Sequence, residues 1–162
     1  MGSDATVIEL LRKAFSDCPR PEHFTNYEHC SECRDHDDVL RSRDIETLAI
    51  EDVGNSGWDP VCYISPEGFA YYFPALARLA LEEETTRFGW YGPQLLFHLT
   101  HDGQCSRFLP HFRKEQKQAV VALLRHVGET RRDQLANYGY LEELQTAIDR
   151  WSGRRRRPTL ST

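Results

Sequence analysis

The sequence predicts an all-α protein, a single domain of five or six helices around one central helix. Three observations carry this prediction. Apolar residues recur at helical spacing through most of the 162-residue chain. Capping residues, prolines and glycines mark where the helices start and stop. Only residues 61–64 suit a strand, so at most one short strand is expected.

The central helix is predicted at about residues 67–83. Ser65 can cap its first turn, and Pro66 stands at the first helical position, where proline is favoured. Its apolar residues form two stripes, so the helix is expected to be buried on both sides. One stripe is Phe69, Tyr72, Phe73, Leu76 and Ala80, and the other is Tyr71, Ala75 and Leu79. Pro74 removes one backbone hydrogen bond inside the helix and is expected to kink it.

Three helical segments are predicted before the central helix. The first starts near Asp4, ends before the prolines that follow Cys18, and has one apolar stripe. That stripe is Val7, Ile8, Leu11 and Phe15. The second, at about residues 27–41, has few apolar residues. Asp44 can cap a short third turn.

Three more helices are predicted after the central one, at about residues 92–102, 113–135 and 141–151. The last ends at a glycine, as helices often do. Residues 154–162 contain four consecutive arginines and little apolar material. We therefore expect a helical domain spanning residues 1–153 and a basic, disordered tail.

Charge is unevenly distributed along the chain, whose net charge is −5. Residues 1–60 carry 14 acidic and 6 basic side chains, whereas residues 107–162 carry 6 acidic and 12 basic ones. An acidic surface repels phosphates, so a nucleic-acid partner is not expected. The sequence instead favours another protein as the partner.

The apolar runs and the cysteines indicate the cellular compartment in which the protein is expected. No run approaches the roughly 20 apolar residues that a membrane helix needs. The first residues lack the basic and apolar pattern of a secretory signal. Five cysteines without such a signal are usually reduced thiols. A cytoplasmic protein without membrane contact is therefore expected.

The first candidate site is the pair Cys30 and Cys33. Two thiolates three residues apart can bind one zinc ion from a single turn. Zinc needs further ligands, and Cys18 and His36 are the nearest candidates in the sequence, while His23, His29 or Cys105 would require a fold that brings them in. Two alternatives remain open. The pair can be small apolar core residues, or a redox pair, although the strand that usually precedes a redox motif is not predicted.

The second candidate site is the group His98, His101 and Asp102. Two histidines three residues apart on a helix face the same way and can bind iron or zinc, with the aspartate orienting one of them. The alternative is an ordinary helix C-terminus, where the dipole favours histidine. Cys62 lies between Val61 and Tyr63, which predicts a buried, inert thiol.

Two segments resemble an uncharacterised family of small bacterial proteins. One is Cys30-Ser-Glu-Cys33, and the other is Tyr71-Tyr-Phe-Pro-Ala75; Trp58-Asp-Pro lies between them. The similarity covers about residues 18–127 in outline. It implies a bacterial, cytoplasmic origin, and it implies no activity and no catalytic residue.

Two functional hypotheses follow. The first is a non-catalytic module that binds another protein and contains a structural zinc site formed by Cys30, Cys33, Cys18 and His36. It rests on the missing catalytic signature, the acidic first part and the basic tail. The second is a metal-dependent enzyme that uses His98, His101 and Asp102. A closed site with four ligands supports the first, and an open coordination position in a cleft supports the second.

Overall fold

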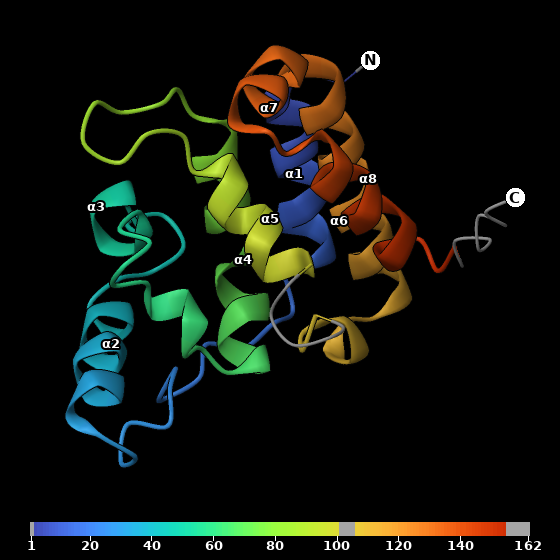
Figure 1. The fold of residues 1–162 in the computed structure, drawn as a ribbon. Coiled ribbons are helices and arrows are strands. Elements are labelled where there is room, and N and C mark those ends of the chain that lie inside the picture. Colours follow the sequence, from blue (N-terminus) through green and yellow to red (C-terminus); the bar gives the residue numbers. More distant parts are fainter. Residues whose placement is uncertain (1, 101–105, 155–162) are drawn as a thin grey trace, which may run out of the picture.

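The computed structural model describes residues 2–100 and 106–154, which form helices joined by turns (Figure 1). It is 62% helical, without a strand among the described residues, which confirms the predicted all-α class. The α-helices are α1 (Asp4–Ala14), α2 (Ser31–Arg41), α3 (Ile50–Val53), α4 (Pro66–Leu81), α5 (Gly92–Thr100), α6 (Lys114–Thr130), α7 (Arg132–Tyr138) and α8 (Leu141–Trp151). Two short 3-10 helices are η1 (Pro60–Cys62) and η2 (Leu109–His111).

The described part contains eight α-helices rather than five or six. One difference is α3, which is a single turn. The other is the long helix predicted at 113–135, which divides into α6 and α7 at Arg131. The guanidinium of Arg131 donates to the Asp4 carboxylate and to the Leu81 carbonyl oxygen. These tertiary bonds hold Arg131 outside helical geometry, which the local sequence pattern did not reveal.

The strand considered for residues 61–64 does not form. Asp59 caps η1 instead, because its carboxylate accepts a hydrogen bond from the Val61 N–H at 2.9 Å. Ile64 forms only an isolated antiparallel bridge with Thr25. A strand needs a neighbour over several residues, and the short segment before α2 provides one bridge.

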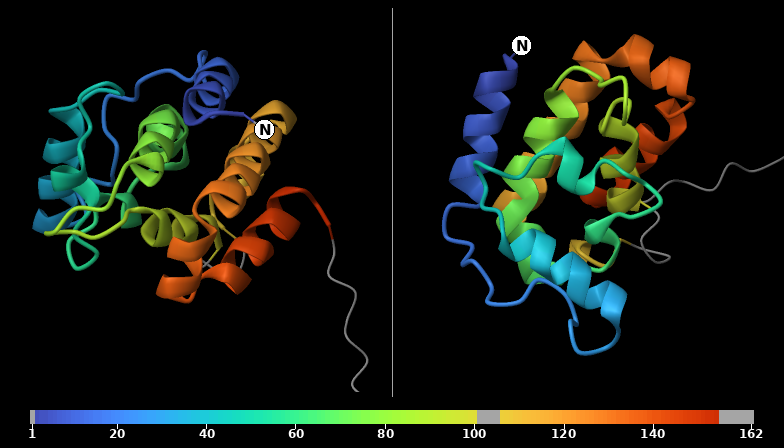
Figure 2. Two further views of the ribbon diagram at one scale, coloured as in Figure 1. Left: turned by 90° about the horizontal axis from the view of Figure 1, so that it is seen from above. Right: turned by 90° about the vertical axis from the view of Figure 1, so that its left-hand side faces the viewer.

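The larger helices surround a common core. α4 packs against α1 and α5, α6 packs against α1 and α8, and α5 also packs against α8. η1 contacts both α2 and α3, and these three elements lie together on one side of the larger helices (Figures 1 and 2). The buried apolar residues form one cluster that includes Leu40 of α2, Val53 of α3 and Val61 of η1. The candidate sites are therefore anchored to the core.

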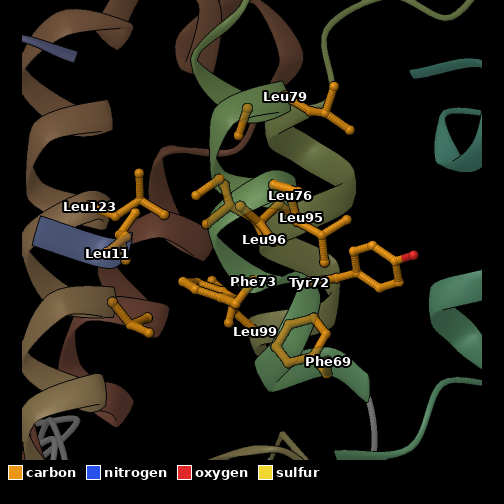
Figure 3. Packing of buried hydrophobic residues seen from close by; sticks show 14 of the residues in the cluster. Leu11, Phe69, Tyr72, Phe73, Leu76, Leu79, Leu95, Leu96, Leu99 and Leu123 are labelled. Atoms are coloured by element: carbon orange, nitrogen blue, oxygen red, sulfur yellow. The ribbon is translucent and has the colours of Figure 1, made fainter. Parts of the chain in front are cut away.

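α4 contributes more buried residues to that core than any other helix, as the two stripes predicted. Phe69, Tyr72 and Phe73 are fully buried, and Figure 3 shows them with the leucines of α5. The helix continues through Pro74 and ends at Leu81, before the acidic residues that follow.

Asp4 at the start of α1 joins distant parts of the chain. Its carboxylate accepts hydrogen bonds from both terminal nitrogens of Arg131, at 2.7 and 2.6 Å, and from His126 Nε2 at 2.6 Å. The Arg131 hydrogen bonds, and then those of His126, lower the pKa of Asp4 to about 2. The folded pKa is thus below the unfolded value, so this stabilisation is complete above about pH 4 and disappears as the pH falls to 2.

Asp4→Asn is therefore expected to lower the free energy of unfolding at pH 7 by about 0.5–1 kcal/mol, because the carboxylate is partly exposed. Urea unfolding at pH 7 and at pH 2 tests this. The two proteins should differ at pH 7 and converge at pH 2. Equal stability at pH 7 would show that the carboxylate does not contribute.

Candidate metal centre

The first candidate site lies at the N-terminus of α2. Cys30 is extended, with φ −160° and ψ 172°, and precedes the first helical residue, so α2 begins at Ser31 rather than near residue 27. The Cys30 thiol accepts a hydrogen bond from the Cys33 N–H at 3.4 Å and thereby caps the helix. This geometry turns the Cys30 side chain back over the first turn, toward Cys33.

Three ligand atoms meet there. The sulfur atoms of Cys30 and Cys33 are 3.3 Å apart, and Cys33 Sγ is 3.7 Å from His29 Nδ1. His29, Cys30 and Cys33, which we call the His29–Cys33 cluster, place one donor atom each within 4.8 Å of the others. His29 is exposed, Cys30 is half-buried and Cys33 is buried. Solvent can therefore reach the cluster from the His29 side.

Hydrogen bonds within the cluster also shift the pKa values of the two thiols in opposite directions. The Cys33 N–H, and then the Cys33 thiol, lower the pKa of Cys30 to about 7 by hydrogen bonding. The bond with Cys30 raises the pKa of the Cys33 thiol. At neutral pH Cys30 thus supplies a substantial fraction of thiolate, the form that metals and electrophiles bind.

Asp37 anchors the backbone of the cluster. Its buried carboxylate accepts hydrogen bonds from the N–H groups of Phe24 and Thr25, at 2.6 and 3.1 Å, and its other oxygen lies 2.7 Å from His23 Nδ1. Thr25 in turn donates its hydroxyl to the Cys33 carbonyl oxygen at 2.6 Å. The segment at Phe24 and Thr25 is thereby tied to α2 at two points, the Cys33 carbonyl and the Asp37 carboxylate.

The other two residues predicted as zinc ligands lie outside the cluster. Cys18 accepts a hydrogen bond from Gln116 of α6 at 3.2 Å. His36 is fully buried, and its ring lies 4.5 Å from the ring of Trp58 and 4.8 Å from that of Tyr63, centre to centre. His29 takes their place beside the cysteine pair. His29 directly precedes Cys30 in the sequence, but the turn before α2, and not a shared helix face, places its ring beside Cys33.

The second candidate site contains His98, while His101 and Asp102 lie outside the described residues. His98 Nε2 is 2.7 Å from the Asp59 carboxylate, and both side chains are buried. The sequence did not indicate Asp59; its position immediately before Pro60 was the available signal, because aspartate there caps a helical turn.

Cys62 lies close to this pair. One donor atom each from Asp59, Cys62 and His98 falls within 4.8 Å of the others. Cys62 is exposed, so the prediction that its thiol is buried was wrong. The prediction assumed a strand, but residues 60–62 form the 3-10 helix η1, in which the side chain of Cys62 points to solvent. The carboxylate of Asp59 already accepts bonds from the Val61 N–H, Gln94 Nε2 and His98 Nε2. Three of the about four lone-pair sites of this carboxylate are thus occupied, so a cation would compete with these donors for Asp59.

The family model of a family of unknown function (DUF6714) matches residues 3–155. The chain belongs to this family. The match confirms the resemblance to an uncharacterised family that the Cys30-Ser-Glu-Cys33 and Tyr71-to-Ala75 segments indicated. Neither a curated protein nor a solved structure matches the chain.

DUF6714 membership covers the His29–Cys33 cluster, the Asp59–His98 pair and the core around α4. The description of the family assigns no activity, so the chemistry of these groups has to be argued from their geometry. No helix among the described residues is long and apolar enough to cross a membrane.

Proposed function

We propose that this chain is a protein-binding module in which His29, Cys30 and Cys33 hold a structural, non-catalytic zinc ion. The observation that carries the proposal is the meeting of three suitable donor atoms within 4.8 Å at one helix end. Zinc favours thiolate and imidazole ligands, and a donor from the protein partner would take the fourth position and close the site.

The distances support zinc. In a tetrahedral site with Zn–S of about 2.3 Å and Zn–N of about 2.0 Å, two sulfurs lie roughly 3.8 Å apart and a sulfur and a nitrogen roughly 3.6 Å apart. The Cys33–His29 separation of 3.7 Å already fits, and the 3.3 Å between the sulfurs needs to widen by about 0.5 Å. Small side-chain rotations of Cys30, which lies on the more open side, can supply that change.

Exposed aromatic side chains beside the cluster support a protein partner. Trp58 is 43% and Tyr63 is 39% exposed, which is unusual for such large apolar groups. Both rings pack against His36, one turn along α2 from Cys33, and the Tyr63 hydroxyl donates to Glu32 at 3.0 Å. Zinc would thus stabilise the N-terminal end of α2. This helix contains His36, against which the exposed rings of Trp58 and Tyr63 pack.

A thiol redox pair is the second candidate, favoured by the contact between the sulfurs and the lowered pKa of Cys30. A disulfide needs the sulfurs to approach to about 2.05 Å, a larger change than zinc requires. Counting free thiols after exposure to oxidised glutathione distinguishes the two. Zinc protects both thiols from oxidation, so both are still counted afterwards. A redox pair forms a disulfide, so neither thiol is counted.

Zinc content tests the proposal. Elemental mass spectrometry of tag-free protein purified without chelator or nickel resin is expected to find about one zinc per chain. The double variant Cys30→Ser/Cys33→Ser should lose it and melt at a lower temperature, because zinc bound only to the folded chain stabilises it.

Cys18→Ser is the matched control, since Cys18 is also a half-buried thiol but lies outside the cluster. It should retain the zinc. Zinc that persists in the double variant and disappears in His98→Ala would instead support the metal-dependent enzyme.

A further inference from the structure

A pocket opens beside η1 and α5, and none of the residues that line it belongs to the His29–Cys33 cluster. It has a volume of about 410 Å³, and we call it the Asp59 pocket. Five aromatic residues are among those that line it: Phe88, Trp90, Phe97, Tyr138 and Tyr140. Asp59 and Cys62 provide its polar groups together with Gln94 and Ser56. A pocket with apolar walls and a few convergent polar groups is typical of small-molecule sites.

The Asp59–His98 bond fixes the imidazole near Asp59 and Cys62, two residues that line this pocket. A carboxylate only accepts hydrogen bonds, so His98 Nε2 must carry the proton of the 2.7 Å bond. In the neutral imidazole the other ring nitrogen is then the base. Asp59 is itself held by the Val61 N–H at 2.9 Å and by Gln94 Nε2 at 2.7 Å. The carboxylate thereby orients the base, as the third member of a catalytic triad does.

Cys62 completes the arrangement. Its sulfur lies within 4.8 Å of a ring nitrogen of His98 and of the Asp59 carboxylate, and it borders the Asp59 pocket. Distances between nucleophile and base are often longer than a hydrogen bond until substrate binds. A thiol, an oriented imidazole and a buried carboxylate are the groups that nucleophilic catalysis by cysteine requires.

Tyr91 adds a polar group near the same three residues. Its hydroxyl is buried without a hydrogen-bond partner among the described residues. Burial, together with the nearby charges of Asp59 and Cys62, raises the pKa of Tyr91 well above its usual value. The phenol therefore stays protonated and can donate a hydrogen bond.

We propose that Cys62 is a nucleophilic thiol that takes an acyl group from an activated ester or thioester, with the apolar acyl chain held in the Asp59 pocket. The thiol proton passes to the imidazole of His98, and the sulfur forms a bond to the acyl carbon. The bond from that carbon to the leaving oxygen or sulfur breaks. The leaving group takes the proton from the imidazolium, so the products are S-acylated Cys62 and a free alcohol or thiol.

The test uses the wild-type chain with p-nitrophenyl hexanoate and p-nitrophenyl acetate at pH 7. A free peptide of residues 58–66 is the reference, because it contains Cys62 as its sole thiol but lacks the pocket. Peptide mapping should find an acyl group on Cys62, and this product is followed separately from any acyl group on Cys30, whose lowered pKa also makes it reactive at this pH. The rate constant for Cys62 should exceed that of the peptide by about 100-fold, the usual contribution of a positioned base. Equal rates would overturn the proposal.

Two variants separate the base from the pocket. His98→Gln, checked by circular dichroism for an intact fold, should lower the acylation rate about 100-fold; a folded variant with an unchanged rate would contradict the role of His98. Phe97→Ala, an exposed wall position, should lower the preference for hexanoate over acetate by several-fold, and an unchanged preference would contradict the binding of the acyl chain in the pocket. If His98→Gln does not fold, the comparison of the wild type with the peptide still decides. Neither variant touches the zinc ligands, so loss of zinc and loss of acylation are separate results.

Discussion

Phe73→Ala is expected to lower the free energy of unfolding by about 3–5 kcal/mol, a large part of the stability of a domain of this size. The Phe73 ring is fully buried and lies 5.1 Å from the ring of Phe15, 5.5 Å from that of Phe69 and 5.8 Å from that of Phe112, centre to centre. Removing it leaves a cavity between α1, α4 and the segment before α6, which the surrounding rings cannot fill.

Phe97→Ala is the matched control, because Phe97 is 44% exposed. It should cost less than about 1 kcal/mol. Denaturant unfolding of both variants measures the difference. A loss below about 1 kcal/mol for Phe73→Ala would show that α4 is not the centre of the core.

Asp37→Ala is expected to lower the free energy of unfolding by about 2–4 kcal/mol, because it leaves the buried N–H groups of Phe24 and Thr25 without an acceptor. It also removes the partner of His23. The segment before α2 should then loosen, and zinc affinity at the His29–Cys33 cluster should fall with it, by about 10–100-fold.

Asp38→Ala makes the same change at the neighbouring, exposed position. It should leave both stability and zinc affinity nearly unchanged. Stability is measured by urea unfolding of the metal-free proteins, and affinity by competition with a zinc-binding dye. If the Asp37→Ala and Asp38→Ala variants have the same stability and the same zinc affinity, Asp37 does not support the His29–Cys33 cluster.

The fold could be predicted where the apolar period is helical and the ends are capped. α4 shows this, since Ser65 and Pro66 mark its start and the residues of its two stripes are buried, apart from the half-buried Tyr71. Prediction failed for two different reasons. The break at Arg131 depends on Asp4, which is far away in the sequence, so no local pattern contains that bond. η1 depends on a local bond from the Val61 N–H to the Asp59 side chain, and its signal, an aspartate before Pro60, was missed.

The candidate site could be predicted in part, from the spacing of its two cysteines. The spacing of Cys30 and Cys33 brings two sulfurs into one turn in any helical arrangement. Which third ligand joins them depends on the turn before α2, where Cys30 is extended and His29 lies beside Cys33. His36 is equally near in sequence, but its ring packs between Trp58 and Tyr63. Its burial follows from residues of the segment around η1, which the spacing does not reveal.

X-ray absorption at the zinc edge tests the central claim most directly, because it identifies the ligand atoms themselves. The account predicts two sulfur atoms at about 2.3 Å and two nitrogen or oxygen atoms at about 2.0–2.1 Å, with one imidazole that disappears in His29→Ala. A zinc bound by nitrogen and oxygen alone, or a protein that takes up no zinc at all, would contradict it.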